Sequence, residues 1–367
     1  MVFPVGENLI MRREGTADFF ECGKTGVKRK GDLGKMKGMK LIEFVPPRPH
    51  RLWTLCRQMG INDVVVKVAP ELTGRPEPWN RDALAGVVGD LAKAGLRVVA
   101  LEGDPFDMSR VKLGAPGRDE TLEHYRSLLG HMAELGIGLL CYNFMVGTGW
   151  HRTGEREGRG GARATYFRLS ENQTAMPGTL LTAEQVWENY AYFIKAVMPE
   201  AQRLGVRMGL HPDDPPLPSL GGMARIFGSV AAYDRAYALA PCRENGVTFC
   251  QANFKLMGVD LDATARHFGQ RIAFVHVRDV RGTADDFVEL FHDEGETDQF
   301  ALFRTYGELG LDVPFRCDHV PAMAGEGEEP GFVPGYGTLG RLFANGYLAA
   351  VVAATGTKTT ADEHRKR

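Results

Sequence analysis

The stretch VTFCQANFKLMGVDLDATARHFGQRIAFVHVRD, residues 247–279, contains a complete strand–helix–strand pattern. Its first and last apolar runs, beginning at Val247 and Ile272, are short and rich in β-branched residues, as is typical of buried strands. Between them, Leu261–Phe268 carries apolar residues at helical spacing. This order predicts two parallel strands joined by a crossover helix.

The same pattern recurs from about Met39 onward, giving eight apolar runs, most of them followed by an amphipathic stretch. Eight strand–helix units of roughly 30 residues each predict a closed (β/α)8 barrel, an α/β fold. A doubly wound open sheet is the alternative, but it more often carries a Gly-rich phosphate loop after its first strand, where this chain has VPPRPHR. The expected strands are KLIEFV from Lys40, DVVVKVA from Asp63, RVVALEG from Arg97, GLLCYNFM from Gly138, VRMGLHPDD from Val206, VTFCQANF from Val247, IAFVHVRD from Ile272 and VPFRCDHV from Val313. The expected helices are 80–94, 119–135, 183–204, 222–239, 261–268 and 298–309.

The domain organisation follows from where this pattern starts and stops. Residues 1–36 lack apolar periodicity, so we expect a loose N-terminal extension or a start codon placed too early. Residues 37–355 form the expected single barrel, and residues 356–367 form a polar tail. The polar, Gly-rich segment 153–182 follows the fourth strand, where an insertion would cover the catalytic mouth as a lid.

Composition excludes several classes of function. With 44 basic and 46 acidic residues, the net charge of −2 gives no basis for binding nucleic acid. No apolar run approaches the roughly 20 residues that cross a bilayer, and no signal-peptide cleavage pattern follows the start, so we expect no membrane association and a cytoplasmic location. The six cysteines have neither zinc-ribbon nor secreted-disulfide spacing, and we expect most of them to be reduced and buried.

Four candidate metal ligands end four successive expected strands: His211, Cys250, His276 and Asp318. The carboxyl ends of barrel strands form the active site, so these side chains should meet on one arc of the mouth. Imidazole and thiolate suit a borderline metal such as Fe(II), Mn(II) or Zn(II) better than Mg(II) or Ca(II). Taken alone, each histidine could be an ordinary core residue and the cysteine a small apolar one. Their matched positions at the ends of successive strands favour a metal site.

Two further residues could move protons near this site. His319 follows Asp318 directly and reaches the same side only if the strand has already ended. Tyr336 lies in the loop after strand eight. The alternatives are a hydrogen bond that supports the metal site for His319 and simple packing for Tyr336.

Neutral and cationic groups surround the same mouth. Arginine suits a carboxylate because its planar fork can bind both oxygens, although surface ion pairs explain many arginines equally well. Asp213, Asp214 and His292 are expected to support the metal ligands or the loop without binding the metal. Asp-Pro turn chemistry alone would explain one of the two aspartates. The candidate substrate-binding residues are Asn143, Trp150, Arg152, Arg278 and Arg316.

These segments together resemble the mannonate dehydratase family, whose fold is a xylose-isomerase-like TIM barrel. The resemblance runs in order from about Glu102 to the last helix. It rests on CYNFM (141–145), W-x-R-T (150–153), GVRMGLHPDDPP (205–216), H-x-R (276–278), F-x-E-x-x-H (287–292), R-x-D-H (316–319) and P-G-Y-x-x-x-G-R (334–341). The chain departs from the family's usual pattern after Asp318 and His319, where Val320 and Pro321 replace Gly-His, and in its first strand, LIEFVPP.

The resemblance implies an enzyme, a hydro-lyase that converts D-mannonate to 2-dehydro-3-deoxy-D-gluconate and water with Mn(II) or Fe(II), in hexuronate degradation. It implies the same four ligands, with His319 and Tyr336 as base and acid in either order. The alternatives are a sugar isomerase or epimerase on the same barrel and a non-catalytic sugar-acid-binding protein. The expected partner is a small-molecule sugar acid, and we expect a homo-oligomer.

Overall fold

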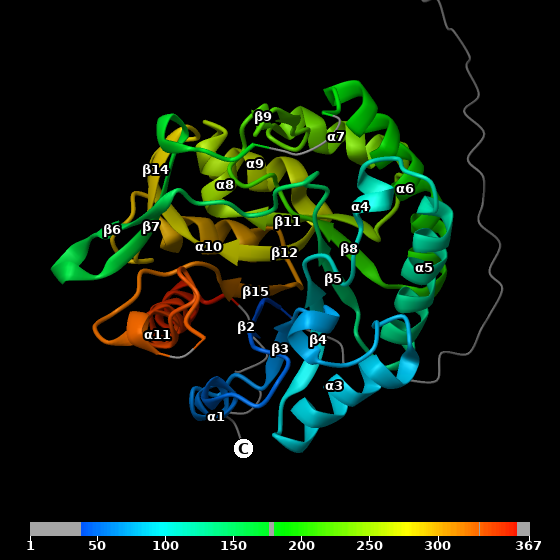
Figure 1. The fold of residues 1–367 in the computed structure, drawn as a ribbon. Coiled ribbons are helices and arrows are strands. Elements are labelled where there is room, and N and C mark those ends of the chain that lie inside the picture. Colours follow the sequence, from blue (N-terminus) through cyan, green and yellow to red (C-terminus); the bar gives the residue numbers. More distant parts are fainter. Residues whose placement is uncertain (1–37, 176–179, 330, 358–367) are drawn as a thin grey trace, which may run out of the picture. The chain divides into compact units, whose positions relative to one another are not determined.

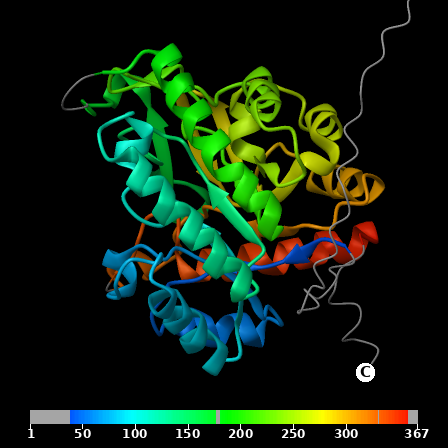
Figure 2. The same ribbon diagram turned by 90° about the vertical axis from the view of Figure 1, so that its right-hand side faces the viewer.

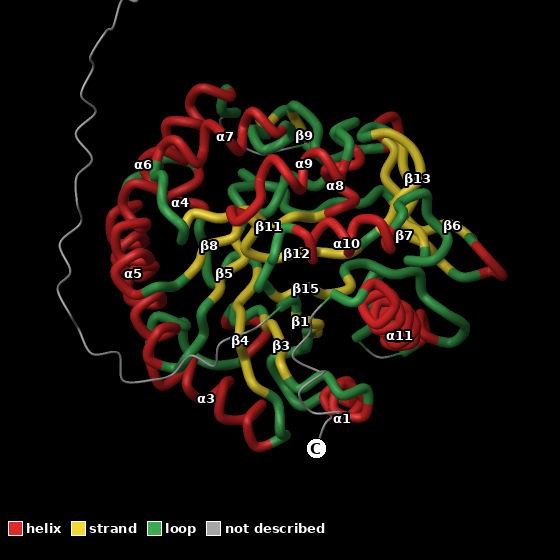
Figure 3. Tube along the Cα trace, turned by 180° about the vertical axis from the view of Figure 1, so that it is seen from behind, coloured by secondary structure: helices red, strands yellow, loops and turns green. Residues whose placement is uncertain are grey.

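A nine-stranded parallel sheet forms the centre of the computed structural model, which describes residues 38–175, 180–329 and 331–357. All described residues belong to one compact unit of the chain. Figure 3 shows the strands in yellow, surrounded by red helices. In spatial order the strands are β1 (Lys40–Leu41), β15 (Pro314–Cys317), β12 (Ile272–Val277), β11 (Asn245–Cys250), β8 (Arg207–Leu210), β5 (Leu139–Tyr142), β4 (Arg97–Glu102), β3 (Asp63–Val66) and β2 (Glu43–Phe44).

The first stave of the barrel is one chain segment that pairs on both sides. β1 pairs with β15, and β2, which follows after a single residue, pairs with β3. Ile42 between them donates its N–H to the carbonyl of Phe315 at 2.9 Å. The two ends of the sheet therefore meet in this segment, and the barrel has the eight staves that the sequence predicts.

Helices follow most of the strands and cover the outside of the barrel (Figure 1). Their starts have chemical reasons: Thr182 and Gln185 form a capping box before α6, and Asp260 caps α9. The helices are α1 (Arg51–Gln58), α2 (Pro70–Thr73), α3 (Arg81–Lys93), α4 (Ser109–Lys112), α5 (Arg118–Glu134), α6 (Ala183–Leu204), α7 (Val230–Leu239), α8 (Gln251–Leu256), α9 (Leu261–Phe268), α10 (Gln299–Glu308) and α11 (Thr338–Thr355), with short 3₁₀ turns at Arg159–Gly161, Leu169–Glu171, Gly269–Arg271 and Glu326–Glu328.

Two of the expected elements are wrong in part. The helix expected over 222–239 begins only at Val230, because Ser219–Leu220 and Met223–Ala224 form the small hairpin β9–β10 and Ser229 caps α7. The strand expected to run through VTFCQANF ends at Cys250, where α8 starts at once. Both errors come from apolar residues whose spacing fits either element over a short run.

The insertion after the fourth stave contributes two strands to a small antiparallel sheet. Its strands β6 (Gly154–Glu157) and β7 (Arg163–Arg168) join β13 (Asp279–Thr283) and β14 (Asp286–Leu290), which follow the seventh stave, in the antiparallel order β13-β14-β7-β6. The sequence predicts an insertion after strand four but not its partner hairpin after strand seven. We call these four strands the lid sheet.

Successive side chains of a strand point to opposite faces of the sheet, so the hydrophobic core has two parts. Ile42, Val65, Ala100, Leu139 and Cys141 belong to a small cluster inside the barrel, whereas neighbouring residues such as Val64 and Val66 pack in the large cluster between strands and helices. At the amino-terminal end of the barrel, buried Asp63 accepts two hydrogen bonds from Arg97, at 2.9 and 2.7 Å, and pairs with Lys40.

The last helix packs against the first strand. Figure 2 shows the red helix α11 beside the blue segment of β1 and β2. Arg341 and Asn345 of α11 both contact the buried carboxylate of Glu43, and Arg341 also donates to the carbonyl of Phe44 at 2.6 Å. This polar contact fixes the loop that carries Tyr336, since α11 begins two residues later.

Several expectations about the chain ends lie outside the described residues. The N-terminal extension, 1–36, and most of the polar tail, 356–367, are among them. Within the described part of the chain, no helix is both long and apolar enough to span a membrane. Cys56, Cys141, Cys242, Cys250 and Cys317 are all free thiols there, and all but Cys242 are buried.

Candidate active site

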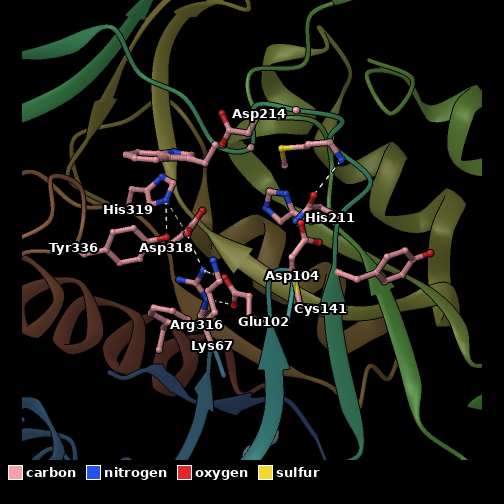
Figure 4. Close-up of a pocket in the computed structure, with 18 residues that line it drawn as sticks. Lys67, Glu102, Asp104, Cys141, His211, Asp214, Arg316, Asp318, His319 and Tyr336 are labelled. Carbon is pink, nitrogen blue, oxygen red and sulfur yellow. Dashed lines mark hydrogen bonds and ion pairs between the residues drawn. The ribbon is translucent and has the colours of Figure 1, made fainter. Parts of the chain in front are cut away.

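A cavity opens at the carboxyl ends of the barrel strands, as Figure 4 shows. Most of its lining residues follow β2, β3, β4, β5, β8 or β15 in the chain, which is the edge where barrels of this kind place their chemistry. The lining comprises Phe44, Lys67, Glu102, Gly103, Asp104, Cys141, Tyr142, Asn143, Met145, Gly147, Gly149, Trp150, His211, Asp214, Arg316, Asp318, His319 and Tyr336.

The four candidate metal ligands come together at this end. Potential donor atoms of His211, Cys250, His276 and Asp318 all lie within 4.8 Å of one another. The Cys250 sulfur is 3.9 Å from Asp318 Oδ2, and His276 Nδ1 is 3.9 Å from the same oxygen. The arrangement gives one cluster of two imidazoles, one thiol and one carboxyl group.

The residues of this cluster fit a metal ion. His276 is buried, and neither of its ring nitrogens makes a hydrogen bond of good geometry among the described residues, although Nε2 lies 3.4 Å from Glu102 Oε2. A buried polar group without a partner is costly, so a ligand that accepts its lone pair would explain it. His211 Nδ1 lies 2.8 Å from the carbonyl of Pro212, which leaves Nε2 free to coordinate.

Two members of the cluster, His211 and Asp318, are held in the protonation states that a metal requires. Burial lowers the pKa of His211, so its ring is neutral. Burial alone would raise the pKa of Asp318, but His319, Arg316 and Arg278 lower it well below its usual value. A neutral imidazole and an ionised carboxylate are the forms that bind metal.

A second set of possible donors overlaps the first. Glu102, Cys141 and His276 also lie within reach of one another. However, Arg316 already makes two hydrogen bonds to the Glu102 carboxylate, at 3.0 and 2.6 Å, and the Cys141 sulfur accepts one from Thr248. The first set, which offers four donors against three, is therefore the better candidate to hold a metal.

His319 is held firmly beside the cluster. Strand β15 ends at Cys317, so the alternation of a strand no longer applies and both Asp318 and His319 face the cavity. On one side of the ring, Nδ1 lies 2.9 Å from Glu289 and 2.6 Å from Arg278. On the other, Nε2 lies 3.0 Å from the hydroxyl of Tyr336.

Tyr336 reaches the cavity from the loop before α11. Its backbone forms a bridge with Val320, two residues beyond Asp318, and its ring contacts those of His319 and Phe44. Burial raises the pKa of Tyr336, and the Asp318 carboxylate raises it further. The phenol therefore keeps its proton at neutral pH.

The arginines expected to bind substrate are engaged elsewhere. Arg152 and Arg278 do not line the cavity within the described structure. Both are buried and bind the same two carboxylates: Asp214, at 2.6 Å from Arg152 and 2.9 Å from Arg278, and Glu289. These ion pairs occupy both guanidinium groups, and the expected substrate contact of Arg152 and Arg278 stays a prediction. Arg316 lines the cavity but is paired with Glu102 and Asp318.

The other candidates occupy distinct places. Asn143 and Trp150 line the cavity, and Trp150 packs on His319 with ring centroids 4.7 Å apart. Asp213 accepts a hydrogen bond from the backbone of Phe227 at 2.7 Å, so it holds the loop and not the ring of His211. His292 Nε2 lies 2.7 Å from the carbonyl of Val277, directly after His276. It supports that strand end.

Comparison with known proteins shows the family of this chain. A family profile described as "D-mannonate dehydratase (UxuA)" matches residues 48–181 and 172–362. The chain belongs to the mannonate dehydratase family. Mannonate dehydratase 2 of Halalkalibacterium halodurans is 30% identical over 305 residues, covering 74% of this chain and 88% of the relative. A mannonate dehydratase of Streptococcus agalactiae serotype Ia is 30% identical over 308 residues, covering 75% and 88%.

Solved structures give the same family and fold. The crystal structure of mannonate dehydratase from Streptococcus suis serotype 2 has a TM-score of 0.77 and 26% identity and covers 88% of this chain and 97% of that one. A xylose isomerase domain protein from Planctomyces limnophilus, at 12% identity and a TM-score of 0.56, shares the fold alone. This chain is therefore a xylose-isomerase-like barrel enzyme of the mannonate dehydratase family, a family of hydro-lyases.

Sequence reasoning missed two carboxylates of this mannonate dehydratase-like site. Glu102 ends β4, so the strand-end argument that selects His211 could have selected it. Glu289 lies on β14 of the lid sheet, within the F-x-E-x-x-H segment, but its distance of 30 residues from His319 hides the contact. Lys67 also lines the cavity one residue after β3, where a lone lysine carries no pattern.

Proposed function

We propose that this protein dehydrates D-mannonate to 2-dehydro-3-deoxy-D-gluconate with a bound divalent Mn(II) or Fe(II) ion. The observation that carries the proposal is the position of the cluster, since His211, Cys250, His276 and Asp318 converge beside the hydrogen-bonded pair of His319 and Tyr336. Family membership supports sugar-acid dehydration as the reaction class.

His211, Cys250, His276 and Asp318 would hold the ion. When bound, such a metal acts as a Lewis acid that stabilises negative charge developing on a coordinated substrate oxygen. A cluster of thiolate and imidazole with one carboxylate suits Mn(II) or Fe(II) better than Mg(II), which prefers oxygen ligands.

The two proton carriers divide the reaction. His319 lines the cavity, and we assign its Nε2 the removal of the C2 proton. The electron pair of the broken C2–H bond forms the C2=C3 double bond. Tyr336, whose raised pKa keeps its hydroxyl protonated, gives a proton to the departing C3 hydroxyl, which leaves as water. The resulting enol then becomes the 2-keto acid by taking a proton at C3 and releasing the proton of its C2 hydroxyl to solvent. Each carrier typically contributes about 10²–10⁴-fold.

A panel of aldonic acids, incubated with Mn(II)- or Fe(II)-loaded protein, tests the proposal. A 2-keto-3-deoxy acid formed from D-mannonate is the expected product, detected by its reaction with periodate and thiobarbiturate. An epimer or ketose formed without loss of water would replace the proposal with isomerase chemistry. Binding of aldonates without any product would indicate a non-catalytic sugar-acid-binding protein.

A further inference from the structure

Lys67 is a cation of the cavity that the metal cluster and the proton carriers do not use. It follows β3 directly, and the alternation that places Val65 inside the barrel also turns Lys67 to the inside. Its side chain is half-buried and lines the cavity. Figure 4 labels it near Glu102 and Arg316, away from Asp214.

The side chain of Lys67 lies beside Gly103, in the turn after β4. A Cβ atom added at Gly103 would lie 3.5 Å from Lys67 Cδ and 3.6 Å from Cε, which is ordinary van der Waals distance. Gly103 has a φ of 82°, which favours glycine. Both residues line the cavity, so the lysine stem passes along this turn at the cavity wall.

The other basic side chains near the cavity already have partners. Arg316 is paired with Glu102 and Asp318. Lys112, which is buried, binds Asp104 at 2.6 Å and Asn143 at 3.0 Å. Among the lysines and arginines that line the cavity in the described chain, Lys67 alone has no ion-pair partner.

The carboxylates of the cavity lining are already paired with other cations. Glu102 and Asp318 pair with Arg316, Asp104 pairs with Lys112, and Asp214 pairs with Arg152. Lys67 is therefore left to meet an anionic group that enters the cavity.

We propose that Lys67 binds the carboxylate of the aldonate substrate and selects for an acidic sugar. This inference rests on the proposed function, because it assigns the part of the sugar acid that the lysine recognises. An ammonium–carboxylate hydrogen bond is charge-assisted, and its loss typically weakens binding by about 10- to 100-fold.

Calorimetric titration of the Mn(II)-loaded enzyme tests the inference, with D-mannonate and D-gluconate as anionic probes and D-mannitol as a neutral one. Lys67→Met keeps the chain length without the charge and should raise the Kd for D-mannonate by about 10- to 100-fold. Lys67→Arg should recover part of the loss, and affinity for D-mannitol should not change. Lys195→Met, at an exposed position of α6, is the matched control and should behave as wild type.

Three results would overturn the assignment of Lys67. These are a D-mannonate Kd in Lys67→Met within about twofold of wild type, an equal loss of affinity for D-mannitol, or a wild-type enzyme that binds neither aldonate. Metal content should stay unchanged in Lys67→Met, and its loss would attribute the effect to the metal site. Aldonate binding that depends on Lys67 but leads to no turnover would instead overturn the proposed function and leave this inference standing.

Discussion

Glu289→Gln tests how much the buried ion pairs beside the cavity contribute to the stability of the fold. Glu289 is fully buried, and its Oε1 lies 3.0 Å from Arg152 Nε, 3.0 Å from Arg278 Nη1 and 2.9 Å from His319 Nδ1. Burial alone would raise the pKa of Glu289, but Arg152, His319 and Arg278 lower it, so the carboxylate is ionised. Glutamine keeps the shape and removes the charge, which leaves Asp214 as the ion-pair partner of Arg152, and Asp214 and Asp318 as those of Arg278.

The expected loss of folding stability is large. Removing one partner of a buried ion pair costs about 3–5 kcal/mol, against a total stability of about 5–15 kcal/mol for typical domains. Urea unfolding at neutral pH would measure the free energy of unfolding. Glu171→Gln is the control, because Glu171 pairs with Arg168 on the exposed face of the same region, and its free energy of unfolding should stay close to that of wild type. A Glu289→Gln loss of less than about 1 kcal/mol would refute the reasoning.

Three further predictions concern the proton carriers, the metal site and the Asp63 ion pairs at the amino-terminal end of the barrel. Tyr336→Phe and His319→Asn should each lower kcat by about 10²-fold or more with metal content near wild type, and a metal-loaded variant with normal kcat would remove that residue from the mechanism. Cys250→Ser should lower metal content by elemental analysis more than it lowers the melting temperature, and full occupancy would show that the thiol is not a ligand. Burial alone would raise the pKa of Asp63, but the ion pairs with Arg97 and Lys40 lower it. The ionised carboxylate therefore stabilises the fold fully above the unfolded pKa of about 4, and this stabilisation is lost as the pH falls through the folded pKa. Asp63→Asn should therefore lower the melting temperature at pH 7, with the difference from wild type shrinking below about pH 4; a constant difference would contradict this.

Much of the barrel could be predicted from the sequence because its signals are local. Leu261–Phe268 and Ala183–Leu204 are helices over the expected residues, since amphipathic spacing and a capping residue lie in the same short stretch. Residues 222–229 could not be assigned correctly, because the β9–β10 hairpin breaks a stretch whose apolar content also suits a helix. The lid sheet was missed as a unit because β7 pairs with β14, more than a hundred residues away.

The same distinction holds at the site. The proximity of the four strand-end residues could be predicted because strand ends are visible in the sequence and their position in a barrel is fixed by topology. The ion pairs of Arg152 and Arg278 were harder to predict, because whether a guanidinium faces the cavity or a buried carboxylate depends on where Asp214 and Glu289 pack. Such pairings join loops across the barrel mouth and leave no spacing pattern along the chain.

The most direct test of the account is proton NMR of D-mannonate turnover in D₂O by enzyme stripped of metal with a chelator and then restored with Mn(II) or Fe(II). The account predicts no product from stripped enzyme and, after restoration, a 2-keto-3-deoxy acid with deuterium from solvent at C3. Equal turnover by the stripped enzyme would contradict the metal's role. A product that retains the C3 hydroxyl would contradict dehydration itself.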